Sequence, residues 1–431
     1  MSDPLTAGRL HEPDEQRVIC HVDIDCFYAA CERLREPALE GKPLVVGMGY
    51  EPGDEVGAVA TASYEAREFG VESAMPIQEA LDKLPRKRDA ARDPDLDVGE
   101  AGFYRPVDMS YYKEVSREVR EILSDAVEGN GPGDGDDGIV REVSIDEAYL
   151  DVTGVGWSAA ETVARDLRER IQSTVGVTAS VGVAPNMSTA KVASDYDKPD
   201  GLTVVEPGDV REFLAPLPVA ELHGVGPVTA EALHELGIET AGDVADADPA
   251  TLEDRFGERG RELYERARGR DDREVTPVGK PKSLSSEKAL PPTNDTDRKR
   301  DLVASLADEV AERARAEDAL YKTIGIKVVT PPYDVNTRAR SLPGPVDDPD
   351  LVEDVALDLL EEFDDARVRK LGVRVSNLDF TGAEQASLEG WAGDATDLDG
   401  PDDEPSDSDA HARDQGSESP RRGQRTLSEF E

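Results

Sequence analysis

A run of β-branched residues that ends in two aspartates, VICHVDID at 18–25, constrains this chain more than any other feature. Such a run predicts a buried strand that delivers carboxylates at its end. A second acidic pair, Asp146 and Glu147, lies in IVREVSIDEAYLDVTG, which predicts two short strands joined by a tight turn at Ser144–Glu147. Successive residues of a regular strand face opposite ways, so only a turn lets this pair share one site with Asp23.

The carboxylates of Asp23, Asp146 and Glu147 are flanked by apolar residues such as Val22 and Ile145. Burying them would be costly unless a metal or hydrogen-bond donors compensate. Two Mg²⁺ ions about 3.5–4 Å apart would do so, and would stabilise both the attacking and the leaving oxygens of a phosphoryl transfer. The alternative is that these are ordinary exposed acids, and the residues alone leave both interpretations open.

The charge balance indicates adaptation to salt. The chain has 431 residues, enough for two to four domains, and its 94 acidic against 49 basic residues give a formal charge of −45. That self-repulsion opposes compaction at low salt, whereas in molar salt the Debye length falls to ~3 Å. Because the acids are scattered through the whole chain, we expect a halophilic protein rather than merely a very soluble one. Net charge alone argues against DNA as a partner, so motifs must decide.

The cysteines and the apolar runs point to the cytoplasm. Cys20, Cys26 and Cys31 have neither zinc-ligand spacing nor a disulfide framework, so we expect small core thiols in a reducing compartment. No apolar stretch approaches the length of a membrane span, and residues 1–17 lack the apolar core of a secretory signal. We therefore expect a cytoplasmic protein with no membrane partner.

Hydrophobic periodicity predicts an α+β protein with a mostly antiparallel sheet. The first part alternates expected strands (18–25, 41–47, 177–185) with expected helices (28–35, 159–175, 187–196) and polar insertions (86–101, 129–138). Residues 207–273 carry helical patterns, and a linker, 274–283, leads to a second α+β unit. That unit has expected strands at 322–330 and 368–376 and expected helices at 301–316 and 350–363. Residues 381–431 carry 14 acids against 4 arginines, which predicts disorder.

Five segments, in order along the chain, carry a family resemblance: HVDIDCFYAACE, ATASYEAREFGV, VSIDEAYLDVTG, VGVAPNMSTAKVASDYDKPDG and FGERGRELYERARGRD. Together they resemble the Y-family DNA polymerases, specifically the polymerase IV group. The resemblance covers roughly residues 17–380. It implies an error-prone, template-directed DNA polymerase for translesion synthesis. Such an enzyme adds dNTPs to a primer 3′-OH by two-metal nucleotidyl transfer and does not proofread.

The resemblance also implies the domains of a right-hand polymerase. They are a disordered N-terminus (1–16), a palm (17–205) with inserted fingers (about 27–90), a helical thumb (206–273), a linker (274–283), a little finger (284–380) and a disordered tail (381–431).

Carried over residue by residue, the resemblance makes Asp23, Asp146 and Glu147 the catalytic ligands of two Mg²⁺ ions. The backbone carbonyl of Ile24 is a further ligand. Tyr28 matches the steric gate, an aromatic ring that excludes a ribose 2′-OH; the alternative is a core aromatic.

Tyr64 and Arg67 match contacts to the dNTP triphosphate, and a helical SYEAR would place them on one face. Lys198 in DKPDG matches a lysine that also reaches the triphosphate, although by itself it would be read as a solvated turn residue. Thr61 is a weaker candidate from the same region. One departure is Met187, which stands where a basic residue is common in the family.

Two regions are expected to hold primer–template DNA. LHGVGPVTAEALHELGI predicts a helix–hairpin–helix, whose N–H groups at Gly224, Val225 and Gly226 can bind a DNA phosphate without reading sequence. A simple helix connector is the alternative. In the little finger, we expect basic residues to follow the DNA backbone: Lys322, Lys327, Arg338, Arg340, Arg369, Lys370 and Arg374.

The last residues, QRTLSEFE, resemble a sliding-clamp-binding box, with Gln424, Leu427 and Phe430 as the docking residues. A 3₁₀ turn would bring Leu427 and Phe430 together. Glu431 stands where a second aromatic is usual, so the alternative is a tail with chance apolar residues. Residues 381–420 would then be a flexible tether.

Two other function classes remain as alternatives to a monomeric polymerase. A clamp-bound DNA adaptor that keeps the fold would need a broken carboxylate set, whereas all three acids are present. A nucleotidyl cyclase can use a similar two-metal palm, but it has no use for a helix–hairpin–helix. Dependence on primer and template separates the cyclase from the polymerase.

Overall fold

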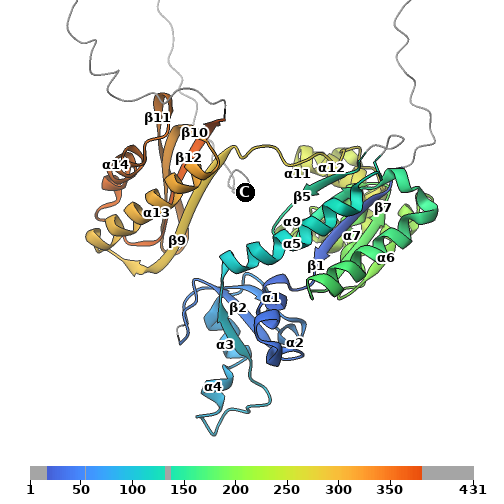
Figure 1. Cartoon of the computed structure of the whole chain (residues 1–431), viewed down its shortest axis with the longest axis horizontal. Coiled ribbons are helices and arrows are strands. Elements are labelled where there is room, and N and C mark those ends of the chain that lie inside the picture. The colour runs from blue at the N-terminus through green and yellow to red at the C-terminus, as the bar shows by residue number, and fades with distance from the viewer. Residues whose placement is uncertain (1–16, 54, 132–136, 381–431) are drawn as a thin grey trace, which may run out of the picture. The chain divides into compact units, whose positions relative to one another are not determined.

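Figure 1 shows the computed structural model, which describes residues 17–53, 55–131 and 137–380. The chain divides into two units, residues 1–380 and 381–431. The predictions of disorder at 1–16 and 381–431, and of clamp binding by Gln424, Leu427 and Phe430, lie outside the described residues.

A five-stranded sheet in the order β5-β6-β1-β7-β8 is built around β1 (Ile19–Ile24). Its other strands are β5 (Ile139–Glu142), β6 (Glu147–Asp151), β7 (Ala179–Ala184) and β8 (Leu202–Val204). β1 is antiparallel to β6 and β7, and only the β7–β8 pair is parallel, so the prediction of a mostly antiparallel sheet is confirmed. Every residue of β1 is buried, as its β-branched run indicates.

Helices pack on both faces of this sheet. Cys20, Val22 and Ile24 belong to a core shared with α5 (Met109–Val127) and α6 (Trp157–Thr174). Ile19 belongs to a second core, shared with α7 (Met187–Tyr196). Because successive strand residues alternate between faces, Asp23 lies on the same face as Ile19, toward α7.

A smaller sheet follows β1 in the chain, in the order β3-β2-β4. Its strands are β2 (Leu44–Met48), β3 (Ala58–Ala62) and β4 (Phe103–Pro106). The helices around it are α1 (Phe27–Arg35), η1 (Pro37–Leu39), α2 (Tyr64–Arg67), α3 (Ile77–Lys83) and α4 (Lys87–Ala90). The polar insertion at 86–101 therefore begins with a short helix, while its remainder forms turns.

Short helices fill the next segment, as its periodicity predicts: α8 (Val210–Leu214), η3 (Val219–Glu221), α9 (Pro227–Glu235), α10 (Ala241–Asp246), α11 (Pro249–Phe256) and α12 (Glu258–Ala267). The helices from η3 to α12 share a core of aliphatic side chains that includes Val219, Leu233 and Leu252, whereas α8 packs in the core of α7. A further 3₁₀ turn, η2 (Thr153–Val155), follows β6.

The last described segment is a four-stranded antiparallel sheet in the order β11-β10-β12-β9. It comprises β9 (Ser283–Thr293), β10 (Leu320–Thr330), β11 (Asp334–Val346) and β12 (Val368–Asp379), with α13 (Thr296–Ala316), α14 (Pro349–Leu360) and η4 (Glu361–Phe363). β10, β12 and both helices are confirmed predictions. β9 and β11 are additional; they are the two edge strands, where proline and polar residues are tolerated.

The cysteines carry free thiols, with Cys20 and Cys31 buried and Cys26 half-buried. The core-thiol prediction thus holds for the first two. Among the described residues, no helix is both long and apolar enough to span a membrane.

Candidate functional site

The carboxylates of Asp23 and Glu147 come together because β1 and β6 are paired. Asp23 lies directly opposite Glu147 in the register, so both side chains lie on one face of the sheet. Asp146 precedes β6 on the predicted turn, and its carbonyl accepts a 3.0 Å hydrogen bond from the Ile24 N–H. The Ser144 hydroxyl accepts hydrogen bonds from the N–H groups of Asp146 (3.3 Å) and Glu147 (3.1 Å), which fixes the turn.

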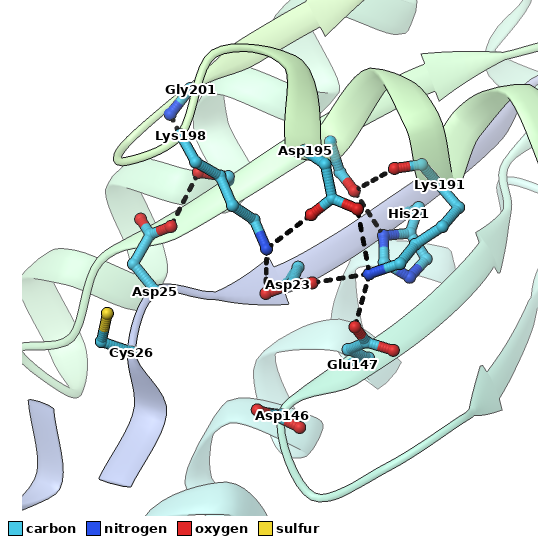
Figure 2. A network of polar contacts seen from close by, with 12 residues as sticks. His21, Asp23, Asp25, Cys26, Asp146, Glu147, Lys191, Asp195, Lys198 and Gly201 are labelled. Atoms are coloured by element: carbon cyan, nitrogen blue, oxygen red, sulfur yellow. Dashed lines mark hydrogen bonds and ion pairs between the residues drawn. The ribbon is translucent and has the colours of Figure 1, made fainter. Parts of the chain in front are cut away.

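Two lysines neutralise this carboxylate pair (Figure 2). Lys191 of α7 donates to Asp23 Oδ2 at 2.9 Å and to Glu147 Oε1 at 2.5 Å. Lys198, just after α7, lies 2.6 Å from Asp23 Oδ1 and 2.8 Å from Asp195 Oδ1. Asp23 is therefore held between two ammonium groups, and Lys191 bridges the two strands.

Burial and charge act on these carboxyl groups in opposite directions. Burial, with help from Asp23, raises the pKa of Glu147 to about 7, and burial also raises the pKa of Asp146. Burial has the same effect on Asp23, but Lys191 and Lys198 outweigh it and hold the pKa of Asp23 well below its usual range. The site therefore favours added positive charge.

The donor set fits a hard divalent cation, although the acids are not gathered around one. Among the described residues, no cluster of three or more potential metal ligands is arranged to hold an ion. Only Asp23 and Glu147 meet, through Lys191, while Asp146 lies apart on the turn (Figure 2). The expected convergence of all three carboxylates is thus realised in part. Carboxylate oxygens are the ligands that Mg²⁺ prefers. In this structure Lys191 and Lys198 supply the positive charge beside these carboxylates.

Tyr28 lies beside this site, on α1. Its ring stacks on Tyr112 of α5, with centroids 4.7 Å apart and planes 19° from parallel. Burial, and then the negative charge of Asp146, raises the pKa of Tyr28. The ring is therefore both close to the carboxylates and held by its neighbour.

Tyr64 and Arg67 come together on α2, as their spacing predicts. The Ser63 side chain caps the helix by accepting a hydrogen bond from the Ala66 N–H. The Arg67 guanidinium lies 4.8 Å from the centroid of the Tyr64 ring. Thr61 lies nearby in sequence, half-buried on β3.

Asp25 joins these residues to the loop that carries Lys198. Its carboxylate accepts hydrogen bonds from the Tyr64 hydroxyl (3.3 Å), the Ser180 hydroxyl (2.9 Å) and the Asp200 N–H (2.8 Å). Asp25, which follows β1, thus contacts α2, β7 and the loop between α7 and β8.

Sequence reasoning missed Lys191, Asp195 and Asp25. The available signal for Lys191 was its position as the only basic residue in MSTAKVASDY. Its role depends on α7 packing against the face of β1 that carries Asp23, which the sequence does not specify.

The helix–hairpin–helix is present where the sequence predicts it, with η3 before and α9 after the GVG turn. Gly224 has φ of 91°, a left-handed conformation that favours glycine. The Val225 N–H already donates to the Leu222 carbonyl at 2.9 Å, so it offers less to a phosphate than expected. An open cleft of about 420 Å³ runs from this turn to Lys191 and Tyr196 of α7.

The predicted basic residues of the last sheet lie on different faces. Arg338 and Arg340 pair in register with Ile326 and Ile324, on the face that packs against the helices. They form ion pairs with acids of that helical layer, Arg338 with Glu362 and Arg340 with Asp358 at 3.1 Å.

Of the remaining basic residues, Lys327, Lys370 and Arg374 lie on the opposite face of the sheet. Lys322 is exposed on β10, and the Arg369 guanidinium lies 3.8 Å from the centroid of the Tyr333 ring. Lys327 and Lys370 both contact Glu287. Arg374 donates to the Ser283 hydroxyl at 2.9 Å.

Comparisons with known proteins agree with this arrangement. The model of the impB/mucB/samB family matches residues 22–195, that of its C-terminal domain matches 281–388, and that of the IMS family HHH motif matches 207–238. DNA polymerase IV of Halobacterium salinarum is 62% identical over 89% of this chain and 90% of its own length. DNA polymerase IV of Methanoculleus marisnigri is 39% identical over 86% and 98%.

Solved structures give the same answer. A Y-family DNA polymerase chimera of Dbh and Dpo4 superposes with a TM-score of 0.72 at 28% identity, covering 84% of this chain and 99% of the chimera. An insertion ternary complex of Dbh DNA polymerase superposes with a TM-score of 0.58 over the same shares of both chains. The chain belongs to the Y family of DNA polymerases, in the DNA polymerase IV group.

Proposed function

We propose that this chain carries out error-prone, template-directed DNA synthesis across damaged templates. It is a DNA-directed DNA polymerase that binds primer–template DNA and a dNTP, extends the primer 3′-OH and releases pyrophosphate. It does so without proofreading. The observation that carries the proposal is the Asp23–Glu147 pair at the end of β1, with Asp146 on the adjoining turn.

Divalent metal ions serve this chemistry in the family. We assign Asp23, Asp146, Glu147 and the backbone carbonyl of Ile24 as ligands of two Mg²⁺ ions. Bound there, the ions would lower the pKa of the primer 3′-OH and neutralise charge on the phosphates. The two ammonium groups around Asp23 support this assignment, because they occupy a position where positive charge is favourable.

The neighbouring residues would position the incoming nucleotide. Tyr28, held against Tyr112, is the steric gate that excludes a ribose 2′-OH. Arg67 offers a planar fork to triphosphate oxygens, with Tyr64 beside it and Thr61 as a weaker contact. Lys198 has a flexible stem and would exchange its carboxylate partners for a phosphate oxygen.

The surrounding segments take the roles of a right-hand polymerase: palm (17–205) with fingers (about 27–90), thumb (206–273), linker (274–283) and little finger (284–380). The turn at Gly224, Val225 and Gly226 would bind a primer phosphate, close to the cleft that opens toward α7. In the little finger, Arg338 and Arg340 lie on the face of the sheet that packs against the helices, whereas Lys327 lies on the opposite face and is better placed for the DNA backbone. Lys322 is exposed and remains a candidate contact.

The remaining proposals concern partners and conditions. Gln424, Leu427 and Phe430 would dock into a sliding clamp, a proposal that rests on the sequence QRTLSEFE alone. The enzyme would act as a monomer in the cytoplasm. Its charge of −45 supports operation in molar salt, where self-repulsion is screened.

The test is primer extension in molar KCl with Mg²⁺, on templates with each of the four bases or an abasic site at the coding position. We expect nucleotide choice that follows the template base, extension past the abasic site, and no product without primer. Primer-independent nucleotide turnover would favour the cyclase. DNA binding by folded protein without any extension would favour the adaptor.

A further inference from the structure

The four-stranded sheet of residues 283–379 has a face opposite α13 and α14 that carries both charged and very small side chains. The strand register places on this face the following residues, here called the outer face and listed strand by strand: Ser283, Ser285 and Glu287 of β9; Lys370, Gly372 and Arg374 of β12; and Thr323, Gly325 and Lys327 of β10. The residues that alternate with them along the strands, such as Ile324, Ile326 and Val373, lie on the other face and are buried in the core under the helices. Figure 1 shows both helices with this sheet.

One carboxylate on the outer face holds two ammonium groups. Lys327 Nζ lies 2.9 Å from Glu287 Oε2, and Lys370 Nζ lies 2.6 Å from Glu287 Oε1. Each carboxylate oxygen thus has its own lysine. All three side chains remain open to solvent, with 24% to 40% of their surface exposed.

Gly372 makes this arrangement possible. It lies between Glu287 and Lys327 in the register, so that these two side chains come from strands that are not adjacent. A Cβ at position 372 would lie 3.0 Å from the Glu287 Cβ and 3.6 Å from the Lys327 Cβ. Because glycine has no side chain, Lys327 can cross β12 and reach the carboxylate.

The geometry matches what a nucleic-acid phosphate requires. A phosphodiester also presents two anionic oxygens, and two lysines spaced to hold both oxygens of a carboxylate can hold those of a phosphate. The small side chains around the trio allow a DNA backbone to approach the sheet closely. Glu287, however, already occupies both lysines and cancels one of their two charges.

We propose that Glu287 is an internal counter-ion, which occupies Lys327 and Lys370 in the free protein and yields them to a DNA backbone phosphate. The inference rests on the proposed function, because it takes DNA as the partner. It makes DNA binding an exchange of one anion for another on the same lysines. Because Glu287 stays in the interface, the two lysines contribute a net charge of one rather than two. DNA affinity should therefore vary less with salt concentration than it would without Glu287, which suits a protein that works in molar salt.

The test is binding of a fluorescent primer–template duplex to the full chain, measured by anisotropy across a series of KCl concentrations. Glu287→Gln keeps the size of the side chain and removes its charge. We expect this variant to bind roughly two- to fivefold more tightly, as expected for freeing an exposed ion pair. Its plot of log affinity against log salt should be steeper by about 0.9, because the variant has no freed carboxylate to take up a cation and offset the one released from the phosphate. Lys327→Gln should weaken binding, and Glu287→Gln in that background should help less.

The matched control is Asp347→Asn. Asp347 pairs with Arg315 of α13 at 3.3 Å, in the same domain but away from the outer face, and its loss removes the same charge. Equal affinities and slopes for Glu287→Gln and Asp347→Asn would overturn the inference, because the effect would then be one of net charge alone. Failure of the folded parent to bind or extend primer–template DNA would instead contradict the proposed function.

Discussion

In the absence of metal, Lys191 should stabilise the protein by offsetting the electrostatic repulsion between the carboxylates of Asp23 and Glu147. Asp23 and Glu147 are directly opposed across two strands, where Cβ atoms lie about 4.5–5.5 Å apart. Lys191→Met removes the one ammonium group that contacts both of them. Lys198 would still neutralise Asp23, but Glu147 would lose its ion pair.

The expected loss follows from the burial of these groups. Removing one partner from a fully buried ion pair costs about 3–5 kcal/mol. Here the side chains of Lys191 and Glu147 are 22% and 25% exposed, and Lys198 remains, so we expect a free-energy cost of about 2 kcal/mol. For a cooperative unit of about 200 residues, that corresponds to a fall in Tm of roughly 4–8 °C.

Thermal unfolding in molar KCl, with EDTA or with Mg²⁺, measures this effect. Mg²⁺ should raise the Tm of Lys191→Met more than that of the parent, because in the parent the lysine competes with the ion for the same oxygens. Arg165→Met is the control, since it breaks an exposed ion pair with Glu161 and should change stability by less than about 0.5 kcal/mol. If Lys191→Met has the same Tm and the same response to Mg²⁺ as this control, the two carboxylates do not repel each other and the reasoning is wrong.

Three further predictions concern other parts of the chain. Tyr28→Ala should greatly raise incorporation of ribonucleotides in single-nucleotide extension, whereas Tyr28→Phe keeps the ring and should not; unchanged sugar selectivity in Tyr28→Ala would remove the gate assignment. Burial, followed by nearby arginines, lowers the pKa of His223 to about 4 from 6.5. The unfolded chain therefore binds more protons, and His223 should cost up to about 3 kcal/mol of stability as pH falls from 6.5 to 4. Urea denaturation of His223→Gln should lack that component, and an identical pH profile would contradict it. Lys299 is fully buried and donates to the carbonyls of Phe363 (3.0 Å), Asp364 (2.6 Å) and Ala366 (3.2 Å). Lys299→Met removes these three hydrogen bonds from the core and should lower the free energy of unfolding by about 3 kcal/mol, measured by urea denaturation, while Lys288→Met on the exposed edge of β9 should change little.

Much of the fold follows from local pattern. The β-branched run at 18–25 forms β1, and the predicted turn at Ser144–Glu147 joins β5 to β6. The helices α13 and α14 also lie where their periodicity predicts them. The edge strands β9 and β11 do not follow from pattern. Their prolines and exposed polar residues resemble loops, and only pairing with β10 and β12 makes them strands.

The parts of the site that the sequence did not predict depend on tertiary packing. Lys191 meets Asp23 across 168 positions of chain because α7 packs on one particular face of β1. Glu287 meets Lys327 and Lys370 across 40 and 83 positions, through a register that no local pattern encodes. The same register separates Lys327 from Arg338, although both are basic and lie on neighbouring strands.

The most direct test of the central claim, that Asp23, Asp146 and Glu147 form the catalytic metal site, is single-turnover insertion of one dNTP as Mg²⁺ is varied. Asp146→Asn and Glu147→Gln should each lower the insertion rate by more than ~100-fold, the upper range for loss of an outer-shell partner of a metal. Primer–template binding should be retained. Asp125→Asn, which breaks an exposed ion pair with Arg170 on α6, should match the parent. Insertion at the parental rate by folded Asp146→Asn and Glu147→Gln would contradict the account and place the chemistry elsewhere in the chain.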